Sequence, residues 1–404
     1  MLSAHAPIST ARLAAVLGLL ACVGPFAIDM YLPALPAVAA ELDAPISAVQ
    51  ATLIAYFLAF GVSQLVWGPI SDQVGRQAPL IVGLCVFALG SALCALAPSI
   101  GWLIAARFVQ GVGGSVLMVV PRAVIRDMAT GADAARIMAL VMLVISVSPM
   151  LAPLVGSGVI AIGGWRLVFA VLLAAAVASL FVTRFLLPET LPPAARTRAS
   201  LAGLLHGSKV LLSDRWFMGL TFIGGFGFAS FFVFVASASF VYTESFGLSA
   251  TGFSIAFAVN AAGFFAASQV AAGLGRRFGM NRVVLGGTTG FALFSGLLLG
   301  LAWAGLASLA VVVGLLVVAN ACLGVVLPST MVMALDPHGE IAGLASSLGG
   351  ALQMVLGGIV VVASGPFFDG TTLPMVAAIA ACGAVAAALA WIVLPRPERA
   401  SALS

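Results

Sequence analysis

The sequence has very few charged residues. Only 7% of its 404 residues are Asp, Glu, Lys or Arg, whereas 62% are hydrophobic. A soluble domain usually carries about 25% charged residues, so a soluble fold of this length is excluded. A bilayer core about 30 Å thick needs roughly 20 apolar residues for each spanning helix. The length therefore predicts an all-α polytopic membrane protein with twelve transmembrane helices.

The sequence also lacks the residue sets of metal centres, disulfide frameworks and enzymes. None of its five cysteines stands in a CxxC or Cys/His pattern, and its three histidines lie in a tail or in loops. There is no G-x-x-x-x-G-K-[ST] phosphate loop, no HExxH, and no nucleophile–base pair in the helices. We expect no cofactor, no metal and no enzymatic activity. Cys22 ends a stretch that resembles a lipoprotein cleavage box, but cleavage there would remove most of the first helix, so we expect none.

The formal net charge of +4 does not indicate a nucleic-acid partner, because the basic residues fall between the apolar runs. If both termini are cytoplasmic, that side collects nearly all of the arginines, and only Arg166 remains outside, beside several acids. This asymmetry follows the positive-inside rule. The sequence thus predicts a multi-pass protein of the lipid bilayer, with both termini in the cytoplasm.

Apolar runs separated by Pro, Gly or charge define the expected helices. The longest polar connection divides them into an N-terminal six-helix bundle (1–187), a cytoplasmic linker (188–215) and a C-terminal six-helix bundle (216–404). The expected helices are 12–34, 47–68, 79–98, 101–123, 135–159, 164–187, 216–240, 251–273, 282–303, 305–328, 341–364 and 373–394.

Two segments half a chain apart resemble each other. Ser63-Gln64-x-x-x-Gly68, followed by Gly75-Arg76, recurs as Ser268-Gln269-x-x-x-Gly273, followed by Arg277-Phe278-Gly279. Such a shift is expected for two six-helix bundles related by pseudo-two-fold symmetry about an axis along the membrane normal. The second copy lacks the acid at Asp72, so we expect the ionisable chemistry in the first half.

Asp29 places a carboxylate in an apolar run that begins near Leu13. A charge at that depth costs at least about 2.5–3.5 kcal/mol, so such a residue usually has a function. Arg107 lies roughly 9 Å below the outer end of its helix, and Asp29 roughly 26 Å from the inner end of the first. In a membrane about 30 Å thick the two share a depth. We expect a buried acid and base in one cavity; a purely structural ion pair is the alternative.

The turn Gly68–Arg76 resembles the loop signature G-x-x-x-D-x-x-G-R-[RK] of the major facilitator superfamily, with Gln77 at the last position. The resemblance implies a cytoplasmic gate. It would contain Gly68, Asp72, Gly75, Arg76 and Asp127. Charges that serve only topology or capping are the alternative.

Arg107-Phe108-Val109-Gln110-Gly111 resembles the helix-four motif R-x-x-Q-G of the same family. Arg107, Gly111, Gly114, Met118 and Arg122 share one face of that helix. In the second half, Phe228, Phe232 and Asn260 would add phenyl and amide groups to a cavity suited to a flat amphiphile. Packing is the alternative for each of them. The candidate substrate contacts are Asp29, Tyr31, Arg107, Gln110, Met118, Arg122, Phe228, Phe232 and Asn260.

Pro149, Pro153 and Gly156 in helix five resemble the antiporter signature G-P-x-x-G-G. Together with 28–36 and 121–127, they resemble the Bcr/CflA branch of drug:proton antiporters. That branch includes exporters of bicyclomycin, chloramphenicol and florfenicol in bacterial inner membranes. The resemblance implies export of such amphiphiles in exchange for protons by alternating access, with no ATPase.

Within this reading, Asp29 and Arg107 would couple proton movement to transport, because burial and a nearby guanidinium have opposite effects on the proton affinity of a carboxyl group. We expect a monomer. Two alternatives remain: a proton-coupled carrier of an amino acid or thiol, for which Arg122 would hold a carboxylate, and a receptor or binding scaffold on a transporter fold. Neither the drug nor the proton stoichiometry follows from the sequence.

Overall fold

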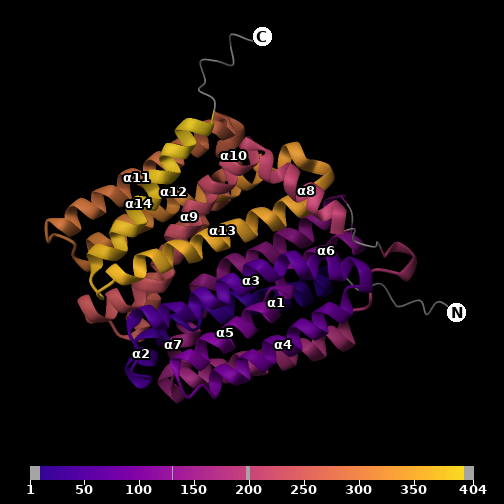
Figure 1. Cartoon of the computed structure of the whole chain (residues 1–404), viewed down its shortest axis with the longest axis horizontal. Helices are drawn as coiled ribbons and strands as arrows, with labels where there is room; N and C mark the ends of the chain where they lie inside the picture. Colours follow the sequence, from indigo (N-terminus) through magenta and orange to yellow (C-terminus); the bar gives the residue numbers. More distant parts are fainter. Residues whose placement is uncertain (1–9, 130, 197–200, 395–404) are drawn as a thin grey trace, which may run out of the picture.

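A computed structural model of the chain describes residues 10–129, 131–196 and 201–394. Every regular element in these ranges is a helix. Figure 1 shows the first-half helices, indigo to magenta, beside the second-half helices, pink to yellow. The helices are long and apolar, because a backbone in hydrocarbon must satisfy its hydrogen bonds within each segment. The predicted all-α polytopic architecture is confirmed.

The elements follow one another with short connections, apart from the segment between the two halves. The first half contains α1 (Thr10–Asp29), η1 (Leu32–Ala34), α2 (Leu35–Glu41), α3 (Ile46–Val74), α4 (Gln77–Ala95), α5 (Ile100–Gly114), α6 (Val116–Met128) and α7 (Gly131–Leu186). The connection holds η2 (Pro193–Ala195) and α8 (Leu201–Ser213). The second half contains α9 (Arg215–Phe240), η3 (Val241–Ser245), α10 (Ala250–Phe278), α11 (Met280–Trp303), α12 (Leu309–Leu335), η4 (Asp336–Ile341), α13 (Ala342–Ser364), η5 (Gly365–Phe367) and α14 (Thr372–Val393).

The described residues contain eleven segments long and apolar enough to cross a membrane. One of them lies in α7, whose 56 residues would extend about 84 Å as a single straight helix, more than twice the thickness of a bilayer core. Gly163 and Gly164 interrupt it, and Gly164 has a φ of 71°, which favours glycine. Counting α7 as two crossings raises eleven to the predicted twelve.

Two predicted helices are interrupted in the structure. The first, expected over 12–34, ends at Asp29 and resumes as η1 and α2, because Pro33 and Pro36 lack the N–H groups that a continuous helix needs. The fourth, expected over 101–123, is divided into α5 and α6 at Ser115, directly after Gly113 and Gly114. The first of these breaks places Asp29 at a helix end.

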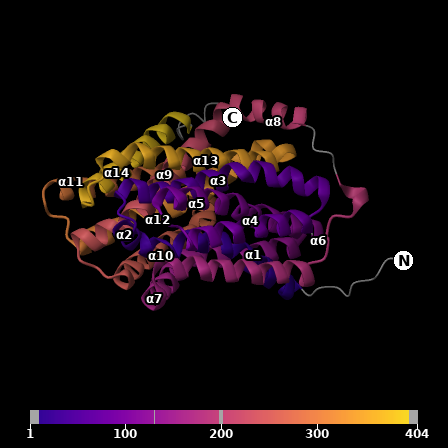
Figure 2. The same cartoon turned by 60° about the horizontal axis from the view of Figure 1, so that its bottom comes forward.

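Different elements meet at the two ends of the bundle. We call the end where the described chain starts and stops the terminal end, and the opposite one the far end. At the terminal end lie the first residues of α1, the α3–α4 turn, the start of α9 and the last residues of α14. At the far end, α2, the α4–α5 loop and the α7 turn meet: Trp165 donates to Glu41, and Arg166 donates to Glu41 and to the Ala97 carbonyl. The linker helix α8 packs outside the bundle against α13 and α9 (Figure 2).

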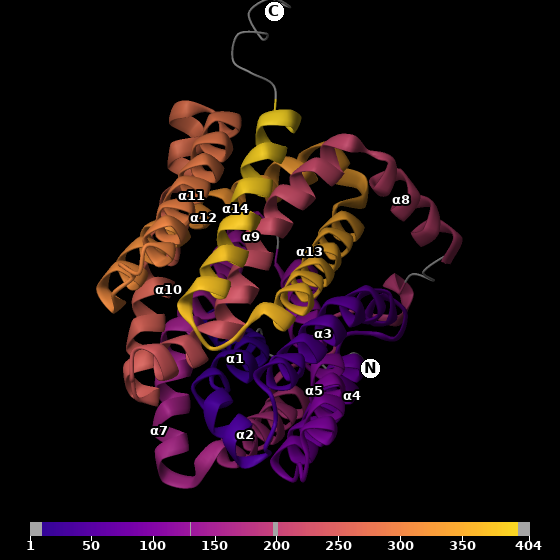
Figure 3. The same ribbon diagram turned by 60° about the vertical axis from the view of Figure 1, so that its left-hand side comes forward.

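The two halves contact each other through α3 with α13 and through α7 with α10. Helices α3 and α13 lie side by side in Figures 1 and 3. Three contacts bridge them between the far end and the middle. The Gln50 amide donates to the Ala236 carbonyl (3.3 Å) and Ser237 Oγ (3.2 Å). Ser254 Oγ donates to the Pro153 carbonyl at 2.9 Å. The rings of Phe57 and Phe232 stack with centroids 4.0 Å apart.

No hydrogen bond or ion pair between described residues joins the halves at the terminal end. The ion pairs and side-chain hydrogen bonds there stay within one half or tie the linker to one of the halves, as Glu189 does in the first half and Asp214 with His338 in the second. The halves are therefore held together from the far end. The bundle boundaries drawn at 188 and 215 remain a prediction, and α8 shows that the connection has a helix of its own.

Candidate functional site

Asp29 is the last residue of α1 and only 5% exposed. Its neighbour Met30 packs so closely against α7 that a Cβ on Gly156 would overlap the Met30 backbone. Because the carboxyl group stands at the C-terminal end of a helix, the helix dipole offers it no stabilisation as an anion. None of the ion pairs between described residues includes Asp29. A buried acid is thus held at the break of the first crossing without a salt bridge.

Arg107 lies beside this break and is fully buried. Its Nη1 donates to the Ala27 carbonyl at 3.0 Å and to Gln110 Oε1 at 2.5 Å. The Gln110 amide in turn donates to Ser91 Oγ at 2.8 Å. This chain of hydrogen bonds connects α1, α5 and α4. It brings Arg107 to the depth of Asp29, as the sequence predicted, but through a backbone carbonyl rather than the carboxylate.

Three aromatic rings surround the Arg107 guanidinium. Its central carbon lies 4.4 Å from the ring centre of Tyr56, 4.9 Å from that of Tyr31 and 5.8 Å from that of Phe169. Cation–π contacts of this kind contribute about 2 kcal/mol or more where water is excluded. The Nε and Nη2 groups have no hydrogen-bond partner among the described residues, so the rings and two neutral oxygens stabilise the charge. We call these three rings the aromatic cage.

Sequence reasoning missed Tyr56 and Phe169, although a signal existed. The chain has only three tyrosines, and two of them, Tyr31 and Tyr56, belong to the cage. Their hydroxyls bind Thr52 Oγ1 and the Gly24 carbonyl, both at 3.1 Å. A buried tyrosine usually needs such a partner, so tyrosines in apolar helices mark places where polar groups gather.

The α3–α4 turn brings together the residues of the predicted gate. Arg76 is 3% exposed and donates to Asp72 Oδ1 at 2.6 Å and to both oxygens of Asp127 at 2.7 and 3.2 Å. Gly75, with a φ of 106°, makes the turn possible, and Gly68 faces Val119 of α6. Burial alone would lower the pKa of Arg76, but the hydrogen bonds to Asp127 and Asp72 raise it above its usual value. The centre of the cluster therefore stays charged.

Two further residues extend this cluster to the linker. The Glu189 carboxylate accepts from the backbone N–H groups of Arg76 (2.9 Å) and Gln77 (3.2 Å), which caps α4. The Gln77 amide donates to the carbonyls of Thr183 and Leu187, both at 3.1 Å, at the end of α7. Gln77 therefore joins α4 to the end of the sixth crossing.

The remaining substrate candidates are not gathered at Asp29. Arg122 donates to the Met118 sulfur at 3.3 Å, and it lies 15 residues beyond Arg107, roughly 22 Å along α5 and α6. Phe232 stacks on Phe57, and Phe228 meets Phe232 edge-on. The ring centre of Phe57 lies 6.4 Å from that of Tyr56, so the stacked pair stands beside the aromatic cage, whereas Arg122 is separate from it.

Asn260, the amide favoured from the sequence, uses its polar atoms within the second half. It is 2% exposed, donates to the Ala256 carbonyl at 3.1 Å and accepts from Asn320 at 3.3 Å. The prolines of the antiporter motif lie inside α7, and Pro153 faces α10 through its bond to Ser254. Pro153 thus stands at the contact between the halves and Gly156 at the packing of α7 on Met30.

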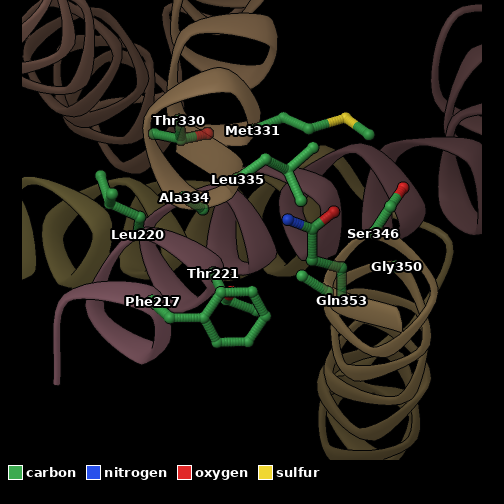
Figure 4. A pocket seen from close by; sticks show the side chains of 12 residues that line it. Phe217, Leu220, Thr221, Thr330, Met331, Ala334, Leu335, Ser346, Gly350 and Gln353 are labelled. Carbon is green, nitrogen blue, oxygen red and sulfur yellow. The ribbon is translucent and has the colours of Figure 1, made fainter. Parts of the chain in front are cut away.

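Figure 4 shows a pocket of about 60 Å³ at the terminal end of the second half, between α9, α12 and α13. Thr221, Thr330, Ser346 and Gln353 give it polar groups. Drug-sized ligands need roughly 300 Å³ or more, whereas this volume equals about two water molecules. A second hollow of about 450 Å³ lies along α10 beside Gln269, Arg276 and Arg277. Neither contains Asp29.

Comparison with known proteins decides the family. Residues 17–360 match the Major Facilitator Superfamily. The chain belongs to this superfamily. It is therefore a multi-pass membrane transporter rather than an enzyme, and the twelve helices predicted from its length and apolar runs are consistent with that family.

Three relatives are similar to the chain over most of its length. The chain is 34% identical over 362 residues to an uncharacterized MFS-type transporter, YdgK, of Bacillus subtilis, covering 88% of this chain and 89% of that protein. It is 30% identical over 373 residues to a bicyclomycin resistance protein homolog of Haemophilus influenzae (91% and 92%). It is 32% identical over 352 residues to multidrug resistance protein D of Escherichia coli (85% and 86%). These relatives confirm the resemblance to the bicyclomycin-type branch of the superfamily.

Proposed function

We propose that this superfamily member exports small amphiphilic antibiotics, of the chloramphenicol/florfenicol or bicyclomycin type, across the bacterial inner membrane in exchange for protons. The names of two relatives support a drug substrate. The arginine-rich loops support cytoplasmic termini, so that the terminal end faces the cytoplasm. The chain works as a monomer in this proposal, since each half supplies part of the path.

The observation that carries the proposal is the state of Asp29. It is a buried carboxyl group inside the first membrane-crossing segment, and no salt bridge to a described residue fixes its charge. The aromatic cage and neutral oxygens, rather than Asp29, contact the Arg107 guanidinium. Asp29 is thus free to gain and lose a proton without breaking an ion pair. In the proposed cycle it takes a proton from outside and releases it inside as the drug binds.

The arrangement of the halves supports alternating access. Their bridging hydrogen bonds lie between the far end and the middle, as expected for a carrier closed to the outside. One proton moving through about 100 mV supplies about 2.3 kcal/mol, and one pH unit adds about 1.4 kcal/mol. Together they suffice for a concentration ratio of a few hundred for a neutral drug.

Proton release from energised inside-out vesicles tests the proposal. Chloramphenicol-class, bicyclomycin-like and cationic compounds are added separately to wild type, to Asp29→Asn and to Asp43→Asn. Asp43 is an exposed loop acid with a φ of 45°, a conformation that asparagine also adopts, so it is a matched control. Wild type and Asp43→Asn should release protons on drug addition, whereas Asp29→Asn should not. Undiminished uphill drug transport by Asp29→Asn would rule out the role.

A proton-coupled carrier of an amino acid or thiol is the second candidate, and Arg122 favours it. This cation has no acidic partner among the described residues, and a carboxylate would pair with it. Such a carrier would have a narrow substrate range. A proton signal on addition of an amino acid or thiol, with none for any drug, would select this candidate.

A further inference from the structure

Only three charged side chains lie more than five residues from an end of a membrane-crossing segment in the described chain: Asp29, Arg107 and Arg122. The other charged residues of these segments stand near their ends or beside the Gly163–Gly164 turn. Two of the three are cations. The membrane interior of the protein therefore has a net positive charge when Asp29 is ionised, and a larger one when Asp29 is protonated.

The two arginines differ in how their charge is stabilised. Arg107 is enclosed by the aromatic cage, and two neutral oxygens accept its hydrogen bonds. Arg122 has no cation–π partner among the described residues. Its hydrogen-bond acceptor is the Met118 thioether, which is a weak one, and its buried Nε has no partner. Arg122 is thus the cation that the fold leaves uncompensated.

The acid closest along the helix is not available to Arg122. Asp127 stands five residues further on, but both of its oxygens accept from Arg76, and Thr190 Oγ1 donates to it at 3.2 Å. A buried guanidinium whose acceptor is a weak thioether and whose Nε has no partner costs free energy, and a charge-assisted hydrogen bond to an anion would recover it. The position of Arg122, six residues before the end of α6, lies on the terminal side of the membrane.

We propose that Arg122 selects substrates according to their charge. It binds an anionic or strongly electronegative group of an amphiphile arriving from the terminal side, and it disfavours permanent cations. This inference deepens the proposed function, since it assumes that the compound enters from that side. An acidic group on a drug and the phosphate of an anionic lipid share the required chemistry, so the experiment must separate the two.

Three related ligands allow the test on the purified full-length chain. Chloramphenicol is neutral, its hemisuccinate ester carries a carboxylate, and the amine left after removal of the dichloroacetyl group is a cation. Affinities are measured by equilibrium dialysis in detergent free of anionic lipid, and again with phosphatidylglycerol. Arg126→Gln is the matched control, because Arg126 is an exposed arginine one turn further along α6. Arg122→Lys keeps the charge in case Arg122→Gln folds poorly.

Wild type should bind the hemisuccinate more tightly than the amine. Arg122→Gln should weaken hemisuccinate binding about tenfold or more while changing chloramphenicol less than about twofold, and Arg122→Lys should retain most of the preference. Arg126→Gln should match wild type.

The proposal is overturned if the ratio of anionic to neutral affinity is the same in Arg122→Gln and wild type, or if Arg126→Gln shows the same loss. It is also overturned if wild type binds none of the three ligands. If phosphatidylglycerol abolishes the preference for the hemisuccinate, Arg122 serves a lipid headgroup instead. Failure of proton release in the vesicle experiment would refute the proposed export mechanism while leaving this binding result intact, so the two failures are distinguishable.

Discussion

The ring centre of Tyr56 lies 4.4 Å from the guanidinium carbon of Arg107, and the Tyr56 hydroxyl donates to the Gly24 carbonyl of α1. One side chain of α3 therefore contacts both the buried cation and the helix that ends at Asp29. No salt bridge joins the acid and the base: aromatic rings and the oxygens of Ala27 and Gln110 surround the cation, while its Nε and Nη2 groups have no hydrogen-bond partner among the described residues.

Replacing Tyr56 separates the contribution of the ring from that of the hydroxyl. Tyr56→Phe loses one hydrogen bond and should lower the free energy of unfolding by about 1 kcal/mol. Tyr56→Leu also removes a cation–π contact and should cost about 2 kcal/mol more. The thermal unfolding midpoints of the two variants in detergent give the order of their stabilities. Equal midpoints for the two variants would show that the ring contact does not stabilise Arg107.

Gly156 and Gly158 form a matched pair on α7. A Cβ at Gly156 would overlap the Met30 backbone beside Asp29, whereas a Cβ at Gly158 would have no neighbour within 4 Å. Overpacking of this kind costs about 1–3 kcal/mol. Gly156→Ala should therefore reduce the rate of drug efflux about fivefold or more at equal expression, and Gly158→Ala should leave it unchanged. Equal rates for both variants would contradict the close approach of α7 to Met30.

Glu189 should matter through its two backbone hydrogen bonds to the start of α4. Loss of such a cap costs about 0.5–2 kcal/mol. Glu189→Ala should lower the thermal midpoint, and Glu189→Gln, which keeps one acceptor oxygen, should lower it less. A Glu189→Gln variant less stable than Glu189→Ala would mean that the cap is not the relevant interaction.

Gln50 tests how the halves are held at the far end. Gln50→Leu removes two hydrogen bonds between α3 and α9, worth about 1 kcal/mol each, and should increase the population open at that end severalfold. A cysteine introduced at Ala236, in a background without the native cysteines, reports this as faster labelling by an impermeant maleimide.

The matched control is Gln64→Leu on the same helix, because the Gln64 amide makes no hydrogen bond to a described residue. Labelling should stay at the wild-type rate in this control. An unchanged rate in Gln50→Leu as well would mean that these bonds do not keep the far end closed.

The parts of the fold that depend on local sequence were predictable. Runs of about 20 apolar residues define the crossings, and the glycine pair at 163–164 separates two helices near the predicted boundary. The break after Asp29 was readable in principle, because Pro33 and Pro36 stand within one turn of each other. A hydrophobicity window passes over such a break because, apart from Asp29, the residues around it are apolar.

The partners of the site residues were not predictable in the same way. The sequence indicated that Asp29 and Arg107 share a depth, but Phe169, which faces Arg107, comes 62 residues later in the chain (169 minus 107). Likewise Gln77 was read as a departure from a motif, whereas its amide caps a helix more than 100 residues away. Such pairings are set by how helices pack, and no local pattern encodes that packing.

Glu189 is anchored to the α3–α4 turn and Thr190 to Asp127 of α6, and this anchoring has a mechanical consequence. Arg196 closes this anchored segment by donating to the Leu191 carbonyl at 3.4 Å, and α8, which begins at Leu201, packs on the second half. Five residue steps separate the two, a contour length of at most about 18 Å. The connection is therefore short, and its length limits how far the two halves can separate at the terminal end.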